Sequence, residues 1–106
     1  GTRHNDELEL RCIGKALGKD AKRIPISSTK DRHGHAIAAA GIQDLCLLLE
    51  LMKHETMPSN LKLKSPCSEE FNLLRKNKKK KITYALTNNF AFGGINTVLA
   101  IKNERI

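Results

Sequence analysis

Residues 26–41 read ISSTKDRHGHAIAAAG, and they lead from a short β-prone stretch into a long apolar one. The β-prone stretch, Arg23–Ser28, has Pro25 near its start, which suits the beginning of a strand because proline has no backbone N–H to give to a sheet. The apolar run that follows predicts a helix from about Gly34 to Lys53. Its middle is apolar nearly all round, so we expect this helix to be buried on most sides.

The N-terminal part of the chain predicts another helix. Leu10, Ile13 and Leu17 recur at helical spacing. Asn5 can cap the start of this helix, and Gly18 can end it. We therefore expect a helix between Asn5 and Gly18.

The second half of the chain predicts a hairpin after a polar connection. Residues 57–63 indicate an extended connector, 64–71 a loop and 72–81 a charged surface segment. Residues 82–90 and 95–101 predict two strands, which Gly93-Gly94 would join as a hairpin. The order of helix, strand, helix, short extended piece and two strands predicts an α/β unit in which a layered mixed sheet packs against helices.

Size and composition place the chain among globular proteins. Its 106 residues suffice for one domain or part of one, and 40% of them are hydrophobic, which argues against disorder. No signal peptide pattern and no uncharged run of 18 or more apolar residues is present, so we expect no membrane association. Cys12, Cys46 and Cys67 lack metal-site spacing, and the first two fall on apolar helical faces, so we expect free thiols and a reducing cytoplasm.

A second motif lies near the C-terminus, where residues 88–96 read NNFAFGGIN. Together with residues 26–41 it resembles the C-terminal half of the β-ketoacyl-acyl carrier protein synthases, condensing enzymes of the thiolase-like superfamily. That family reads Ser-Ser-Thr-Lys-x-x-x-Gly-His before an Ala/Gly-rich helix, and Asn-Ser-Phe-Gly-Phe-Gly-Gly-x-Asn before its last strand. Gly1-Thr2 followed by Asn5-Asp6-Glu7 is similar to a third family pattern, His-Gly-Thr before Asn-Asp-x-x-Glu.

The resemblance implies a fold and a reaction. Residues 1–106 would form a partial C-terminal domain, the second half of a thiolase-like fold with a mixed sheet between helical layers. The parent would be a 3-oxoacyl-acyl carrier protein synthase, which joins an acyl thioester to malonyl-carrier protein by decarboxylative Claisen condensation in fatty acid or polyketide-type synthesis. The family's nucleophilic Cys and first His would lie before Gly1, so we expect this chain alone to be inactive.

The resemblance also implies the partners. An acyl carrier protein would bring its own phosphopantetheine, and neither a metal nor an organic cofactor would be needed. The parent would be a cytoplasmic homodimer, or a heterodimer with a related synthase.

His35 lies at the start of the predicted second helix, where the helix dipole disfavours an imidazolium and burial would lower the imidazole pKa further. A neutral histidine there can donate an N–H to a carbonyl oxygen that gains negative charge. By resemblance, His35 is the family's second catalytic histidine, which holds the malonyl thioester carbonyl and stabilises the enolate. A helix-capping or core histidine is the alternative.

Lys30 matches the active-site lysine of the family, and an ion pair with a helix carboxylate could fix the local geometry. Asp44 stands where the family has Glu, and Glu9 is a second possible partner. A surface lysine at the end of a strand is the alternative interpretation of Lys30.

Phe92 lies in a Phe-Gly-Gly turn, where Gly93 and Gly94 permit backbone angles that other residues avoid. In the family, the backbone N–H at the position of Phe92 completes the oxyanion hole for the acyl thioester, and its ring gates the acyl pocket. Thr2 matches a threonine that hydrogen-bonds the pantetheine arm. An ordinary hairpin with a core Phe is the alternative for Phe92.

Three positions depart from the family pattern. His33 replaces a small Thr, Ala91 replaces a Gly in the gating loop, and Ile95 replaces a Thr. A noncatalytic relative that pairs with an active subunit therefore stays open as an alternative to the active enzyme.

Two other functions compete with condensation. His4, His33 and His35 could gather around a metal ion, although no carboxylate or Cys lies at ligand spacing nearby. The net charge of +8, much of it between residues 75 and 81, fits a phosphate-binding surface. Aromatic residues are only 4% of the chain, so we expect no stacking platform for a specific nucleic acid. The same basic surface could attract an acidic carrier protein.

Overall fold

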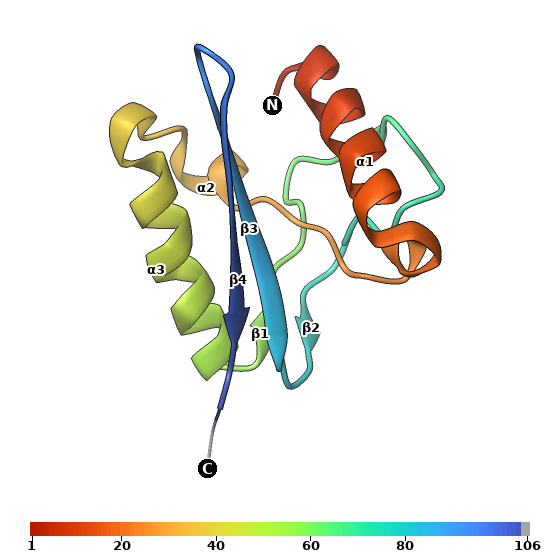
Figure 1. Ribbon diagram of the computed structural model, residues 1–106. Helices are drawn as coiled ribbons and strands as arrows, with labels where there is room; N and C mark the ends of the chain where they lie inside the picture. Colours follow the sequence, from red (N-terminus) through yellow and green to blue (C-terminus); the bar gives the residue numbers. More distant parts are fainter. Residues whose placement is uncertain (105–106) are drawn as a thin grey trace.

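The computed structural model, which describes residues 1–104, places a β-hairpin between two helices (Figure 1). The elements in chain order are α1 (Arg3–Leu17), α2 (Lys30–His33), α3 (Ala40–Lys53), β1 (Thr56–Met57), β2 (Lys78–Lys79), β3 (Tyr84–Ala91) and β4 (Ile95–Lys102). Short 3₁₀ turns occupy Gly18–Lys22 and Ile37–Ala39. The predicted α/β class is confirmed, although within residues 1–104 the strands form two separate two-stranded antiparallel sheets, β1 with β2 and β3 with β4, and not one mixed sheet.

The hairpin is the longest β structure in the described part of the chain. β3 and β4 pair antiparallel from Tyr84 opposite Lys102 to Ala91 opposite Ile95. The three-residue turn between them contains Gly93 and Gly94 with φ of 84° and 76°, a left-handed conformation that L side chains rarely adopt. The predicted hairpin is therefore confirmed, and its glycines are what the turn requires.

The hairpin contacts the helices on either side of it. The Asn88 side chain donates a hydrogen bond to Glu9 of α1 at 3.2 Å. Asn89 packs against Gly41 of α3, where a Cβ would lie 3.5 Å from the Asn89 side chain. A small residue at position 41 thus lets β3 approach α3 closely.

α1 begins earlier than the sequence indicated. Its N-cap is Thr2, whose hydroxyl oxygen accepts the N–H of Asn5, so Asn5 lies inside the first turn and its predicted capping role is wrong. Thr is also a good N-cap, and the earlier start adds an ion pair between Arg3 and Glu7, four residues apart. The predicted end is confirmed, because α1 stops before Gly18, which has a φ of 55°.

The second predicted helix begins later than expected. α2 ends at His33, before Gly34, whose φ of 81° cannot continue a right-handed helix, and of the predicted Gly34–Lys53 only Ala40–Lys53 forms the helix α3. α3 is also less buried than expected, because Ile42 and Leu49 are 61% and 47% exposed and Cys46 between them is exposed. These three side chains form one open stripe along α3.

The stretch Arg23–Ser28 forms a single parallel bridge, between Ile26 and Leu73, rather than a full strand. The Ile26 N–H donates to the carbonyl of Asn72, and the Leu74 N–H donates to the carbonyl of Ile26, both at 3.0 Å. Residues 72–81 are therefore not wholly a surface segment. The first residues of this segment lie toward the interior, because the apolar pair Leu73-Leu74 precedes the charged run.

The buried hydrophobic core is small, and its residues are spread over α1, the first 3₁₀ turn, α3 and the segment that contains the bridge. Its members in the described residues are Leu10, Ala21, Ala40, Met52 and Leu74. Cys12 and Cys46 are both exposed, and Cys46 lies in the same apolar stripe of α3 as Ile42 and Leu49. No helix within residues 1–104 is both long and apolar enough to span a bilayer.

Leu74 provides a test of this core, because its side chain is 2% exposed. We expect Leu74→Ala to lower the free energy of unfolding by about 3 kcal/mol, since it removes buried methyl groups and leaves a cavity. Leu61, which is 60% exposed, is the matched control, and Leu61→Ala should cost less than about 0.5 kcal/mol. Urea unfolding of the chain measures both, and equal losses would contradict the placement of the core.

Candidate functional site

The first candidate residue, Lys30, opens α2 and is held by α3. Its Nζ forms an ion pair and hydrogen bond with the carboxylate of Asp44. The two side chains are 30% and 13% exposed, so the pair is partly shielded from water. A shielded pair is more strongly coupled than a surface one, because the local dielectric is lower. Glu9, the other possible partner, accepts from Asn88 instead.

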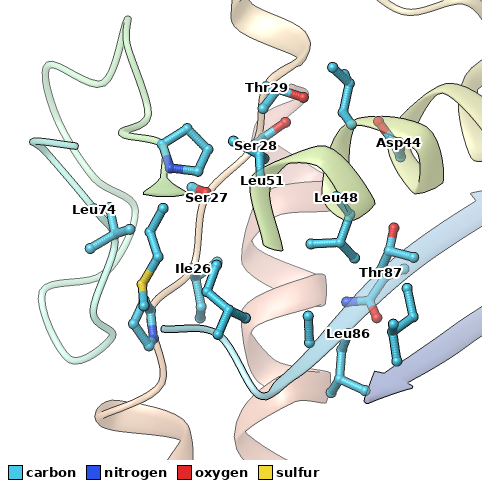
Figure 2. Close-up of a pocket in the computed structure, with 18 of the residues that line it drawn as sticks. Ile26, Ser27, Ser28, Thr29, Asp44, Leu48, Leu51, Leu74, Leu86 and Thr87 are labelled. Atoms are coloured by element: carbon cyan, nitrogen blue, oxygen red, sulfur yellow. The ribbon is translucent and has the colours of Figure 1, made fainter. Parts of the chain in front are cut away.

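A groove of about 750 Å³ runs beside this ion pair (Figure 2). Residues 24–30 line one wall, and Leu86 and Thr87 of β3 line the facing wall. Leu48 and Leu51 of α3 project into it between these walls. The lining is largely apolar, so the groove is suited to holding an apolar or extended group rather than a highly charged one.

His35 lies in the connection between α2 and the 3₁₀ turn and is exposed. The expectation that it starts a long helix and is buried is therefore wrong for this chain. The imidazole ring of His35 is held by a hydrogen bond, because the backbone N–H of Ile37 donates to Nδ1 of His35 at 2.9 Å. A ring nitrogen that accepts a hydrogen bond carries no proton, so the proton of the neutral ring is on Nε2.

The residue that makes this hydrogen bond has an unusual backbone. Ile37 has a φ of 52°, in the left-handed region that β-branched residues rarely occupy. Such strain persists only where surrounding structure imposes it, and it is frequent at functional sites. The strained residue here is the one whose N–H fixes the His35 tautomer.

The other histidines do not join His35. The Nε2 atom of His33 lies 3.1 Å from the hydroxyl of Thr29, within the same short segment. His4 lies on α1. Among residues 1–104, no three His, Cys, Asp or Glu side chains gather closely enough to hold a metal ion.

Phe92 occupies the tip of the hairpin and is fully exposed. In Figure 1 this tip and the N-terminal residue lie at the same end of the molecule. In the described part of the chain, no hydrogen bond or ion pair links Lys30, His35 and Phe92 to one another. The structure therefore joins Lys30 to Asp44 directly but leaves the other two side chains open to solvent.

Thr2 lies at the same end and caps α1. Its oxygen accepts the Asn5 N–H at 3.3 Å. A hydroxyl that accepts in this way still has its own proton to donate. The capping role is thus compatible with a hydrogen bond from Thr2 to a bound group.

Asn60 is a supporting residue that the sequence analysis missed. Its side-chain oxygen accepts the N–H of Ser28 at 2.9 Å, and its amide donates to the carbonyls of Ile26 and Leu74 at 3.1 and 3.0 Å. It thus fixes the segment leading to Lys30. The signal that could have identified it is the run Pro58-Ser59-Asn60, since short polar side chains after a proline often bond backbone groups in loops.

Comparison with known proteins places this geometry in a family. Residues 1–64 match the family model described as beta-ketoacyl synthase, C-terminal domain. The chain is 32% identical over 104 residues to 3-oxoacyl-[acyl-carrier-protein] synthase 1 of Buchnera aphidicola, covering 96% of this chain and 25% of the relative. It is 32% identical over 100 residues to 3-oxoacyl-[acyl-carrier-protein] synthase 2 of Coxiella burnetii, covering 92% of this chain and 24% of the relative.

A polyketide relative matches equally well along the chain. The actinorhodin polyketide putative beta-ketoacyl synthase 1 of Streptomyces coelicolor is 30% identical over 106 residues, covering 97% of this chain and 22% of the relative. This chain therefore spans about a quarter of the length of the curated relatives it matches.

The ion pair between Lys30 and Asp44 gives a quantitative test. We expect Lys30→Met and Asp44→Asn each to lower the free energy of unfolding by about 2 kcal/mol, because each leaves a partly buried polar group without its partner. The double variant should lose less than the sum, with a coupling of at least about 1 kcal/mol.

The control is the Arg3–Glu7 pair of α1, whose side chains are 92% and 51% exposed. Its coupling should be below about 0.5 kcal/mol. Urea unfolding of the four variants in each cycle measures both couplings. Equal couplings in the two cycles would show that Lys30 and Asp44 interact only as a surface pair.

Proposed function

We propose a condensing function from one premise: this chain belongs to the beta-ketoacyl synthase C-terminal domain family. The parent protein is proposed to be a 3-oxoacyl-acyl carrier protein synthase. Its nucleophilic Cys thiolate, outside this chain, attacks an acyl thioester, and the carrier thiol leaves. Malonyl-carrier protein then loses carbon dioxide, and its enolate carbon attacks the acyl-Cys carbonyl. A C–C bond forms, the C–S bond breaks, and the thiolate returns.

The observation that carries this proposal is the tautomer of His35. With Nδ1 accepting from Ile37, Nε2–H is the group available to donate. We assign that donor to the malonyl thioester oxygen, which becomes negatively charged when carbon dioxide leaves. A donor fixed in place before the reaction stabilises this charge without reorganisation, which is the main effect in oxyanion stabilisation.

Lys30 and Asp44 are proposed to hold the segment before His35 in a fixed position relative to α3. The ion pair ties α2 to α3 in a partly shielded place. Correct orientation of a donor is itself catalytic, because a misplacement of about 1 Å can cost a factor of about 100 in rate. Asp44 thereby acts through Lys30, and Glu9 supports the hairpin through Asn88.

The hairpin tip and the N-terminus are proposed to hold the two thioesters. The backbone N–H of Phe92 would face the acyl carbonyl oxygen, with Gly93 and Gly94 giving the turn its shape and the Phe92 ring closing the acyl pocket. The hydroxyl proton of Thr2 would bond the pantetheine arm, because its oxygen already accepts from Asn5. The phosphopantetheine belongs to the carrier protein substrate, so no further cofactor enters the proposal.

We propose that residues 1–106 do not condense thioesters alone. Along the chain, Cys12 and Cys46 lie in the middle of α1 and α3. They are therefore away from the helix N-termini, where a thiolate is stabilised. Phe92 and His35 are exposed, and the apolar groove beside Lys30 is open. In the parent, residues outside this chain would cover these surfaces and supply the nucleophile.

The natural partner of such a parent is an acyl carrier protein. Two of the relatives are named for acyl carrier protein, and the basic surface of this chain is suited to an acidic partner. Assembly as a dimer in the cytoplasm completes the proposal. The departures from the family pattern at His33, Ala91 and Ile95 keep a noncatalytic partner subunit as the other candidate, which the following experiment separates.

The test counts carbon dioxide released from malonyl-carrier protein by the full-length parent. We expect release by the wild type and a fall of at least about 100-fold in His35→Ala, the usual scale for the loss of one oxyanion donor. His54→Ala is the matched control, since His54 follows α3 and its ring lies 3.4 Å from Glu50, and it should keep the wild-type rate.

Each other outcome has a defined meaning. A folded wild-type parent that binds carrier protein but releases no carbon dioxide would point to the noncatalytic partner. Full activity in His35→Ala would overturn the role of His35. Condensation catalysed by residues 1–106 alone would contradict the proposal that the remainder of the parent is needed.

A further inference from the structure

α2 has only four residues, Lys30–His33, which is too few for a helix to hold its own shape in water. Its position must therefore come from side-chain contacts with its neighbours. The Lys30–Asp44 ion pair supplies one such contact, toward α3. A second set of contacts, on Asp31 and Arg32, ties the same segment to the loop of residues 59–62.

Arg32 makes the central contacts of this second set. Its Nη1 donates to the carbonyl oxygen of Ser59 at 2.8 Å, and its Nη2 lies 3.2 Å from the Ser59 hydroxyl. The guanidinium fork thus holds one residue at two points, a geometry that a lysine cannot reproduce. The Arg32 side chain is 29% exposed, so it lies along the protein rather than extending into solvent.

Asp31 completes the connection. One carboxylate oxygen accepts from Arg32 at 3.1 Å, and the other accepts the backbone N–H of Lys62 at 3.1 Å. The carboxylate therefore orients the guanidinium and also fixes the far end of the 59–62 loop. Charged hydrogen bonds of this kind are stronger than neutral ones, which favours a single arrangement.

The loop on which Arg32 acts is itself firmly held. Ser59 is 7% exposed, and its N–H donates to the side-chain oxygen of Asn77 at 2.8 Å. The next residue, Asn60, bonds Ser28, Ile26 and Leu74. Arg32 therefore anchors α2 to a fixed support and not to a free loop.

We propose that Arg32, with Asp31, is a positioning residue for His35. Gly34 links the two, because its N–H donates to the carbonyl of Lys30 at 2.8 Å and it leads directly into His35. Any rotation of α2 is passed to His35 through this one turn. Lys30 is bound on one side and Arg32 on the other, so α2 is restrained from both sides, and we expect this restraint to narrow the orientations open to His35. The proposal rests on the condensing function proposed above.

The first test measures malonyl-carrier protein decarboxylation by the full-length parent. We expect Arg32→Gln to lower kcat by about 10- to 100-fold, because His35 is no longer aligned with the developing charge, and to leave KM within about twofold. Arg32→Lys keeps the charge without the fork and should recover part of the loss. Arg23→Gln is the matched control, since Arg23 bonds Asp20 in an exposed pair outside the basic stretch of residues 75–81, and should leave kcat unchanged.

The second test asks whether Arg32 acts through His35. If it does, Arg32→Gln should lower kcat by less than about twofold further when His35 is already Ala, because residues that act as a unit are not additive. A residue with only a structural role would lower kcat by the same factor in both backgrounds. Additive losses, or an unchanged kcat in Arg32→Gln, would overturn the proposal.

A third readout does not depend on activity. Amide hydrogen exchange of Gly34 in the parent should be at least about fivefold faster in Arg32→Gln than in the wild type or in Arg23→Gln, since local opening of α2 becomes easier. Unchanged exchange would overturn the proposal even if the wild type proved inactive. If the wild type releases no carbon dioxide but Gly34 exchanges faster in Arg32→Gln, the condensing function is rejected and the restraint of α2 by Arg32 is retained.

Discussion

The arrangement of the candidate site depends on contacts that restrain a four-residue helix. α2 cannot persist alone, so the ion pair of Lys30 with Asp44 and the fork of Arg32 on Ser59 decide where the segment lies. His35 follows α2 after one glycine, and the N–H of Ile37 then fixes which ring nitrogen carries the proton. A short element held from both sides can thus present one hydrogen-bond donor without a rigid helix around it.

The same structure explains why the remainder of the site is open. A core with five buried hydrophobic residues among residues 1–104 is small for a chain of this length. The apolar stripe of α3, the Phe92 ring and the groove beside β3 all remain accessible. The relative from Buchnera aphidicola is about four times as long as this chain, and the proposal that the remainder of such a parent covers these surfaces would account for their exposure.

Local patterns predicted much of the fold, and long-range polar contacts account for most of what was missed. The hairpin and the end of α1 follow from glycines between periodic apolar residues, which are local signals. The late start of α3 accompanies a positive φ at Gly34 and at Ile37, and neither backbone angle can be read from the residue types around it. The resemblance named Lys30, His35 and Asp44, but hydrogen bonds such as Ser28 to Asn60 join residues 32 positions apart and leave no periodic trace.

The central claim is that Nδ1 of His35 accepts from the Ile37 N–H and leaves Nε2–H as the donor. Nitrogen-15 NMR of the imidazole in the full-length parent at neutral pH measures this directly, because protonated and unprotonated ring nitrogens have well-separated shifts. The structure predicts an unprotonated Nδ1 that accepts from Ile37 and a protonated Nε2. A ring protonated on Nδ1, or on both nitrogens, would contradict the account.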